Sequence, residues 1–143
     1  MGPARIPEGF EIFDGVSSSN KAKLTLRRTG QVGVSFAFLD KFHFSSPPAF
    51  ACFLFNNITG EVAMLLTKTE LPKGSVKVSF ATGRNKNIRY ATILARDFLD
   101  EKKIPYKEKS VGIKYKATET DGGWIFFWTD IRAPVNGDNN ENR

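Results

Sequence analysis

The sequence holds very little of the chemistry that most enzyme and metal sites need. Its 143 residues include one cysteine, Cys52, and one histidine, His43. One thiol and one imidazole are too few for a zinc site of the usual kind, and no carboxylate pattern surrounds His43. The sequence also lacks a Gly-rich phosphate loop followed by Lys-Ser/Thr, and it lacks a nucleophile elbow. We therefore expect a non-enzymatic protein that needs no metal and no cofactor.

Long apolar runs and secretory features are missing too. No stretch is long enough and apolar enough to span a bilayer. The first residues lack the basic-then-apolar layout of a secretory signal. Cys52 is the only cysteine and cannot form an internal disulfide, which fits a reducing compartment. These absences predict a cytoplasmic or other reducing intracellular location and no membrane partner.

The first half of the sequence predicts two hairpins around a short helix. Within residues 23–36, apolar and polar side chains alternate on both sides of the turn Thr29-Gly30, a pattern typical of a β-hairpin. Ser35 is placed to cap a short helix over residues 37–42. A second hairpin is expected over residues 50–68, with an Asn/Gly turn between its strands.

The second half predicts the same order of elements. Alternating or apolar runs predict four strands, over residues 76–80, 88–90, 111–117 and 124–128. A Gly/Asn-rich loop over residues 83–87 connects the first two of these strands. Thr92 is expected to cap a helix that runs to about Lys103, because apolar residues follow it at helical spacing and Pro105 stops it.

The two halves together predict an α+β protein built from two ββαββ units, 23–67 and 75–129, in a pseudo-twofold arrangement of antiparallel sheets or a barrel with two helices. Neither unit holds enough apolar surface for a core of its own, so we expect one domain over residues 21–132. The alternative is coincidence, because the repeat is one of pattern and hairpins recur in many α+β domains. Residues 1–20 are expected to be flexible and residues 133–143 disordered.

Positive charge is concentrated in the second half of the chain. The formal net charge is +6, and residues 73–116 hold twelve basic and four acidic residues, whereas residues 1–72 hold seven and six. A localised basic surface attracts polyanions, and its binding to nucleic acid weakens with salt because counterions are released. The alternative is that these lysines and arginines simply keep a surface solvated.

Several of these basic residues, together with Tyr115, are candidates for binding nucleic acid. Arg27 and Arg28 stand beside the first turn, where a guanidinium can reach a phosphate or a guanine edge; the alternative is two surface residues that flank a turn. Arg84, Lys86 and Arg89 lie in or beside the 83–87 loop, and Lys114 and Lys116 share a face of their predicted strand. The full set is Arg27, Arg28, Lys77, Arg84, Lys86, Arg89, Lys114, Tyr115 and Lys116.

Aromatic residues are unusually frequent, with thirteen phenylalanines, two tryptophans and three tyrosines. Residues 124–128 are large and apolar on both faces of the predicted strand, which is typical of a buried central strand or of an interface strand. Tyr90, Tyr106 and Tyr115 lie among basic residues. We expect these tyrosine rings to be exposed, where they can stack on bases while basic side chains follow the backbone.

The segment from Leu24 to Ser35, followed by a short helix and another hairpin, resembles the AbrB-type swapped-hairpin DNA-binding domains. The resemblance covers about a third of the chain. It implies interlocking units, so a homodimer is an open alternative, and it implies that Arg27 and Arg28 contact DNA. The proline that the family usually has after its second strand is replaced here by Phe36 and Ala37.

A second resemblance rests on element order alone. The strands over residues 50–56, 62–67, 76–81 and 88–90, followed by a helix, give the order ββββα, which is similar to the repeat of Whirly-type single-stranded DNA-binding proteins. This resemblance implies a binding face on the sheet that includes Lys77, Arg89, Lys114 and Tyr115. Fold analogy by itself is a weak argument for function.

These observations predict a non-enzymatic nucleic-acid-binding protein, with DNA favoured, that contacts the phosphate backbone through a basic surface with aromatic support. A regulatory or single-strand-binding role fits such a surface. The alternative is a protein-interaction or assembly module in which the aromatic strand over residues 124–128 pairs with a partner strand. The sequence does not distinguish single-stranded from double-stranded targets.

Overall fold

The computed structural model describes residues 7–9, 21–83 and 87–135 and has an α+β fold with two antiparallel five-stranded sheets and two short helices. The elements of the first half are β1 (Leu24–Leu26), β2 (Gln31–Ser35), α1 (Phe36–Lys41), β3 (Phe50–Phe55) and β4 (Glu61–Thr67). Those of the second half are β5 (Val76–Lys77), β6 (Ser79–Thr82), β7 (Ile88–Leu94), α2 (Arg96–Glu101), β8 (Val111–Ile113), β9 (Tyr115–Thr120) and β10 (Gly123–Arg132).

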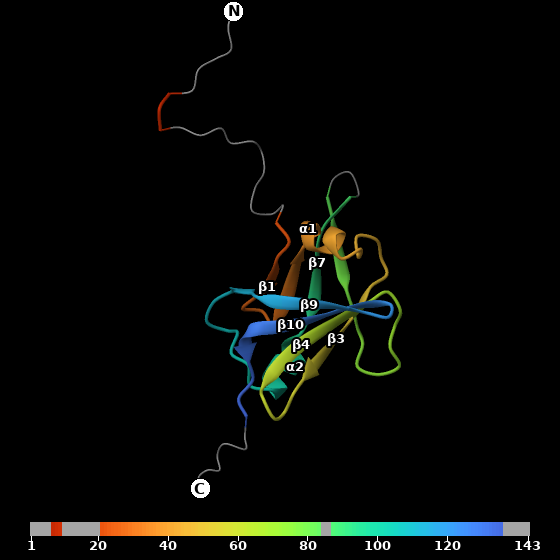
Figure 1. The fold of residues 1–143 in the computed structure, drawn as a ribbon, viewed down its shortest axis with the longest axis vertical. Helices are drawn as coiled ribbons and strands as arrows, with labels where there is room; N and C mark the ends of the chain where they lie inside the picture. The colour runs from red at the N-terminus through yellow and green to blue at the C-terminus, as the bar shows by residue number, and fades with distance from the viewer. Residues whose placement is uncertain (1–6, 10–20, 84–86, 136–143) are drawn as a thin grey trace, which may run out of the picture.

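Each half of the chain contributes strands to both sheets. Sheet A has the strand order β6-β7-β2-β1-β8, and sheet B has the order β5-β3-β4-β10-β9. The hairpin before each helix lies in sheet A, and the hairpin after each helix lies in sheet B. Figure 1 shows β3, β4, β10 and β9 of sheet B crossing in front of the more upright β1 and β7 of sheet A. The two sheets therefore face each other with their strands crossed, as in orthogonal sheet packing.

Two strands pass from one sheet to the other, and both were predicted as single strands. The first breaks at Val78, which is buried and donates its backbone N–H to the carbonyl of Ala49 at 2.9 Å. The second breaks at Lys114, between β8 in sheet A and β9 in sheet B. Such strands form the corners of orthogonally packed sheets. The sequence gives no sign of these breaks, because inward and outward residues keep alternating through each corner.

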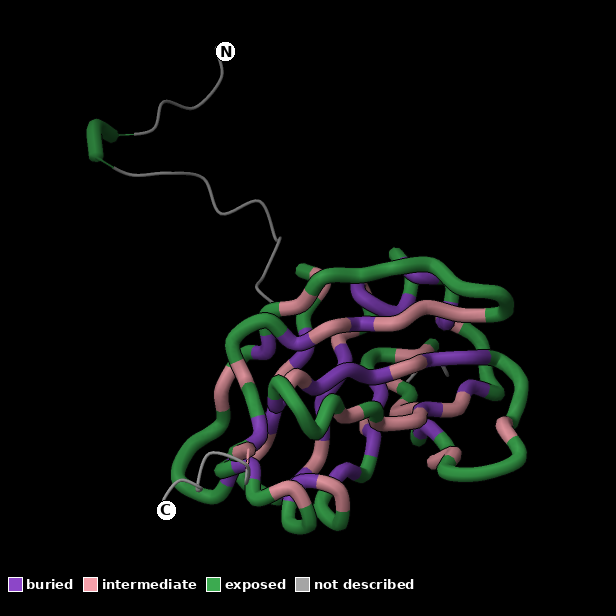
Figure 2. The backbone as a smooth tube through the Cα atoms, turned by 60° about the horizontal axis from the view of Figure 1, so that its bottom comes forward, coloured by how far each residue is buried: buried purple, intermediate pink, exposed green. Residues whose placement is uncertain are grey.

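The core lies between the sheets, and the helices close two ends of it. Ser35 caps α1 by accepting a hydrogen bond from the Phe38 N–H at 3.2 Å, as predicted. Phe38 is fully buried, and its ring lies 4.8 Å from the Phe126 ring, centroid to centroid. At the other end the Phe98 ring of α2 stacks on Phe53 of β3. Figure 1 shows α1 at the upper end of the body and α2 at the lower end. Buried backbone runs through the strands in Figure 2, and the turns are exposed.

The predicted start of the second helix is wrong. Thr92 lies within β7, where it pairs with Gly33 of β2, and the helix begins at Arg96 after an N-cap at Ala95. Strand pairing wins here because it places Ala91, Ile93 and Ala95 in the core, while β-branched residues at 92 and 93 favour a strand.

The first residue of the predicted C-terminal tail, residue 133, contacts the body of the protein. Ala133 is buried, and its N–H donates a hydrogen bond to the carbonyl of Gly60 at 2.8 Å. Residues 1–6, 10–20 and 136–143 of the predicted terminal segments lie outside the described residues. Within the described part of the chain, neither helix has the length and apolar character that crossing a membrane requires.

Candidate nucleic-acid interface

The outer face of sheet A carries small side chains along its middle. Thr25 pairs with Gly33, Gly33 pairs with Thr92, and Thr92 pairs with Ser79. Residues that pair directly across antiparallel strands point to the same face. The neighbours Leu24, Leu26, Val32 and Val34 are all buried in the core, so this row faces outward. Because the side chains in this row are small, they leave room above the sheet.

A groove of about 760 Å³ lies over this face. We call it the sheet A groove. Its lining comes from β1, β2, β7 and the first residue of α1. The lining residues are Lys23, Thr25, Arg27, Gly33, Val34, Ser35, Phe36, Ile88, Arg89 and Tyr90. The groove thus joins strands from both halves of the chain, because β2 pairs with β7 in the centre of sheet A.

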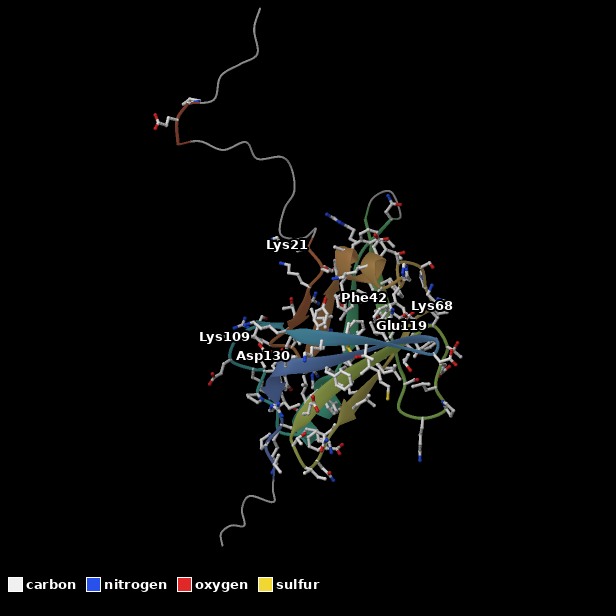
Figure 3. The ribbon with its side chains drawn as sticks, in the orientation of Figure 1. Lys21, Phe42, Lys68, Lys109, Glu119 and Asp130 are labelled. Atoms are coloured by element: carbon white, nitrogen blue, oxygen red, sulfur yellow. The ribbon has the colours of Figure 1, made fainter. Side chains whose placement is uncertain are left out.

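The charge of the sheet A groove has one sign. Of the residues with a described position, Lys23, Arg27 and Arg89 line it and no acidic residue does. In the described part of the chain one ion pair within 4.0 Å is found, between Lys102 and Glu101, and none of these three cations takes part in it. A fourth cation, Lys21, lies near the rim, since its carbonyl accepts a hydrogen bond from the Ser35 hydroxyl at 2.8 Å; Figure 3 shows it above β1. Converging like charges repel one another, so an anionic ligand would relieve this repulsion.

Arg27 lies across the floor of the groove. Its Nη1 atom donates a hydrogen bond to Thr92 Oγ1 at 3.3 Å, and its guanidinium carbon lies 5.8 Å from the centroid of the Tyr90 ring. This position depends on Gly33. A Cβ atom added there would lie 2.5 Å from Arg27 Nη2 and 2.8 Å from Arg27 Cζ. The missing side chain at residue 33 is what lets the guanidinium rest on the strand.

We predict that Gly33→Ala displaces the Arg27 side chain without unfolding the protein. The added methyl group meets the flexible end of a side chain rather than backbone, and alanine is at least as favourable as glycine within a strand. The thermal midpoint should stay within a few degrees of the unchanged protein, whereas affinity for a polyanion should fall by roughly threefold to tenfold, the worth of about one charge-assisted hydrogen bond after solvent screening. Calorimetry and a binding titration measure the two effects. Equal affinity for the two proteins would contradict the assigned position of Arg27.

The structure separates the residues that the sequence predicted for the site. Arg27 and Arg89 line the groove. Arg28 is exposed at the adjoining turn, where its N–H points to Ser110 Oγ at 3.4 Å. Lys77 lies in β5 of sheet B, paired with Phe50. Arg84 and Lys86 lie outside the described residues.

The predicted candidates on the 111–117 segment also lie away from the groove lining. Lys114 stands at the corner between the two sheets, and its N–H donates to Asp130 Oδ1 at 3.3 Å. Lys116 pairs with Phe127 on the outer face of sheet B. Lys114 and Lys116 are both exposed, on a segment that passes from sheet A to sheet B.

Two of the three tyrosines expected to be exposed are not. Tyr106 is buried, and its hydroxyl donates a hydrogen bond to Asp100 at 2.8 Å, which together with burial raises the pKa of Tyr106. Tyr115 is half-buried with its ring edge-on to Phe38, and burial raises the pKa of its hydroxyl. Tyr90 is 44% exposed and faces the groove. It is the tyrosine whose ring is open to a ligand.

The aromatic strand over residues 124–128 is a buried central strand. β10 is flanked by β4 on one side and by β9 on the other, so it does not offer a free edge over these residues. Phe126 and Trp128 point into the core. A partner strand would therefore have no free edge of β10 to pair with over these residues, and the protein-interaction alternative stays a prediction.

The sequence-based site missed Lys23, Phe36 and Gly33. The alternation over residues 23–27 places Lys23 on the same face as Arg27, and this signal was available. Phe36 is 40% exposed at the start of α1, and nothing local distinguishes it from the buried Phe38. Gly33 between two valines indicates a close approach to the strand. The pairing of β2 with β7, which the sequence does not show, brings these residues to Tyr90 and Arg89.

The chain was compared with protein-family models, with curated proteins and with solved structures, and no match was found. The resemblances to AbrB-type and Whirly-type proteins stay predictions.

Proposed function

We propose that this protein binds nucleic acid, with the phosphate backbone held in the sheet A groove and without a catalytic step or a cofactor. The observation that carries the proposal is the composition of the groove lining, which within residues 7–9, 21–83 and 87–135 has three cationic residues, no acidic residue and two exposed aromatic rings. Basic side chains beside aromatic rings bind the backbone and the bases of a nucleic acid, respectively. The proposal extends the charge argument from the sequence to a defined surface.

The three cations of the groove differ in how they can reach a phosphate. Lys23 and Arg89 are exposed, whereas Arg27 is half-buried and already oriented by Thr92. An oriented guanidinium loses little side-chain freedom when it binds a phosphate, and it can donate two parallel hydrogen bonds. Each phosphate that is neutralised releases counterions, so binding should weaken as salt rises.

Two variants test the proposal, and each removes one positive charge from a different surface of the protein. Arg27→Ala removes a cation from the groove, and Lys116→Ala removes one from the outer face of sheet B. We expect Arg27→Ala to weaken binding of a labelled oligonucleotide by roughly tenfold, the worth of one charge-assisted hydrogen bond, and Lys116→Ala to change it by less than about twofold.

Fluorescence anisotropy at two salt concentrations gives both affinities and their salt dependence. For the unchanged protein, the logarithm of the binding constant should fall with the logarithm of salt concentration. The slope should become shallower by roughly 0.7 to 0.9 for each phosphate contact removed. Equal losses for Arg27→Ala and Lys116→Ala would place the binding surface elsewhere, and no binding at low salt would refute the function.

We also propose that the two ββαββ units, 23–67 and 75–129, are related by a pseudo-twofold axis through the centres of both sheets. Most strand pairings support this proposal, because they have a counterpart when the units are exchanged. β1·β2 corresponds to β6·β7, and β3·β4 corresponds to β9·β10. The outer pairings of β1 with β8 in sheet A and of β3 with β5 in sheet B have no counterpart among the described strands. The central pairs β2·β7 and β4·β10 map onto themselves.

The helices support the same relation at a spacing of 60 residues. Phe38-Leu39-Asp40 in α1 recurs as Phe98-Leu99-Asp100 in α2. Each helix is followed by a residue with positive φ, 66° at His43 and 58° at Lys103. The N–H of the next residue then donates to the carbonyl of the leucine in this motif. The distance is 2.6 Å from Phe44 N to Leu39 O and 2.9 Å from Ile104 N to Leu99 O. A shared helix ending of this kind favours duplication over coincidence.

A further inference from the structure

The sheet A groove holds two aromatic rings that contribute little to the core. Tyr90 is 44% exposed and Phe36 is 40% exposed, and both line the groove. Tyr90 of β7 pairs with Ser35, the last residue of β2, and Phe36 follows directly as the first residue of α1, so the two rings lie at the same end of the groove. An exposed phenylalanine on a charged surface forfeits the hydrophobic free energy that burial would give it. Its presence here calls for an apolar ligand surface beside the cations.

Duplex nucleic acid does not offer such a surface. Its base faces are stacked inside the helix, and a protein meets phosphates, sugars and base edges. Unpaired bases expose flat π-faces, on which aromatic side chains stack. The guanidinium of Arg27, 5.8 Å from the centroid of the Tyr90 ring, adds a second planar group next to the same ring. A guanidinium plane is also a stacking surface for bases.

We infer that the ligand of the sheet A groove is a single-stranded nucleic acid, with a base stacked on Tyr90 and its flanking phosphates held by Lys23 and Arg89. This inference rests on the proposed function. The floor of the groove fits it, because Thr25 and Ser35 are small and let a base approach the strands beside the Arg27 guanidinium, which covers Gly33. The exposed aromatic rings then contact the bases, and the cations contact the phosphates.

The test compares ligands and a pair of variants. The ligands are a labelled single strand of about 12 nucleotides, within the usual site size of single-strand binders, its duplex, and an abasic strand of the same length. Tyr90→Leu removes the ring and keeps apolar volume, and Tyr90→Phe keeps the ring. Leu94→Ala is the control, since Leu94 is 53% exposed on the same strand but does not line the groove. Circular dichroism confirms that each variant is folded.

We expect the single strand to bind at least roughly tenfold more tightly than the duplex or the abasic strand, since stacking of one base has about that worth. Tyr90→Leu should lose that advantage, while Tyr90→Phe and Leu94→Ala should keep it. Equal or tighter binding of the duplex, or an unchanged preference in Tyr90→Leu, would overturn the inference and leave the proposed function standing. If none of the three ligands binds at low salt, the proposed function fails as well. Tighter binding of an acidic peptide than of the single strand would replace nucleic acid with a protein partner.

Discussion

Replacing Lys23, Arg27 and Arg89 together with alanine is expected to lower nucleic-acid affinity by roughly hundredfold or more at low salt. Each charge-assisted hydrogen bond is worth about 1.5–3 kcal/mol before solvent screening reduces it, and among the residues that the structure describes these three are the cations that line the groove. The salt dependence should become shallower by roughly 2, because about 0.7 is lost for each phosphate contact on a single strand. Anisotropy over a range of salt concentrations measures both changes.

The control removes the same charge from elsewhere. Lys68, Lys73 and Lys116 are exposed and lie outside the groove lining, and Figure 3 shows Lys68 on the flank of the molecule. Replacing these three with alanine should reduce affinity by only a few-fold, through the weaker long-range field. Similar losses in the two triple variants would show that net charge, rather than the groove, governs binding.

Phe38→Ala is expected to destabilise the fold by about 3–5 kcal/mol, the usual cost of emptying a buried aromatic site. Phe38 has no exposed surface and its ring contacts Phe42, Tyr115 and Phe126. The cavity would open between the two sheets, next to the cap of α1, where the surrounding rings cannot easily collapse. Chemical denaturation and calorimetry would record the loss, with the thermal midpoint lowered by roughly 10 °C or more.

Phe98→Ala is the matched variant, because Phe98 occupies the corresponding position of α2. Its side chain is half-buried and stacks on Phe53 alone among the aromatic rings of the described residues. We expect a loss of about 1–2 kcal/mol, since less surface is removed from contact. An equal or larger cost for Phe98→Ala would mean that the α2 end of the core is the more tightly packed one.

Local patterns were enough to predict most elements of the fold. Alternation predicted the strands, and Ser35 predicted the start of the first helix to within one residue. Patterns of period two could not locate the corners at Val78 and Lys114, because a strand that changes sheets keeps its inner and outer faces. The apolar spacing from Thr92 onward fitted both a helix and a strand, and only the partner strand β2 decides between them.

The residues that line the sheet A groove were harder to predict than the fold, for a similar reason. Arg27 and Arg89 were identified by charge, but Lys77, Lys114 and Lys116 have equal charge and lie on other surfaces. Charge is a property of single residues, whereas a groove is a property of paired strands. Residues 27 and 90 become neighbours only through the β2·β7 pairing, which is a contact between distant parts of the chain.

The two corner strands also limit how copies of this protein can associate. Sheet A ends in β6 and β8, and sheet B ends in β5 and β9. Three of these outer segments have two to four residues, and the fourth, β9, has six and includes Lys116 and Glu119. Short or charged outer strands are poor templates for an added strand. We therefore expect the concentrated protein to resist amyloid-like stacking, and any higher assembly to form through its broad faces.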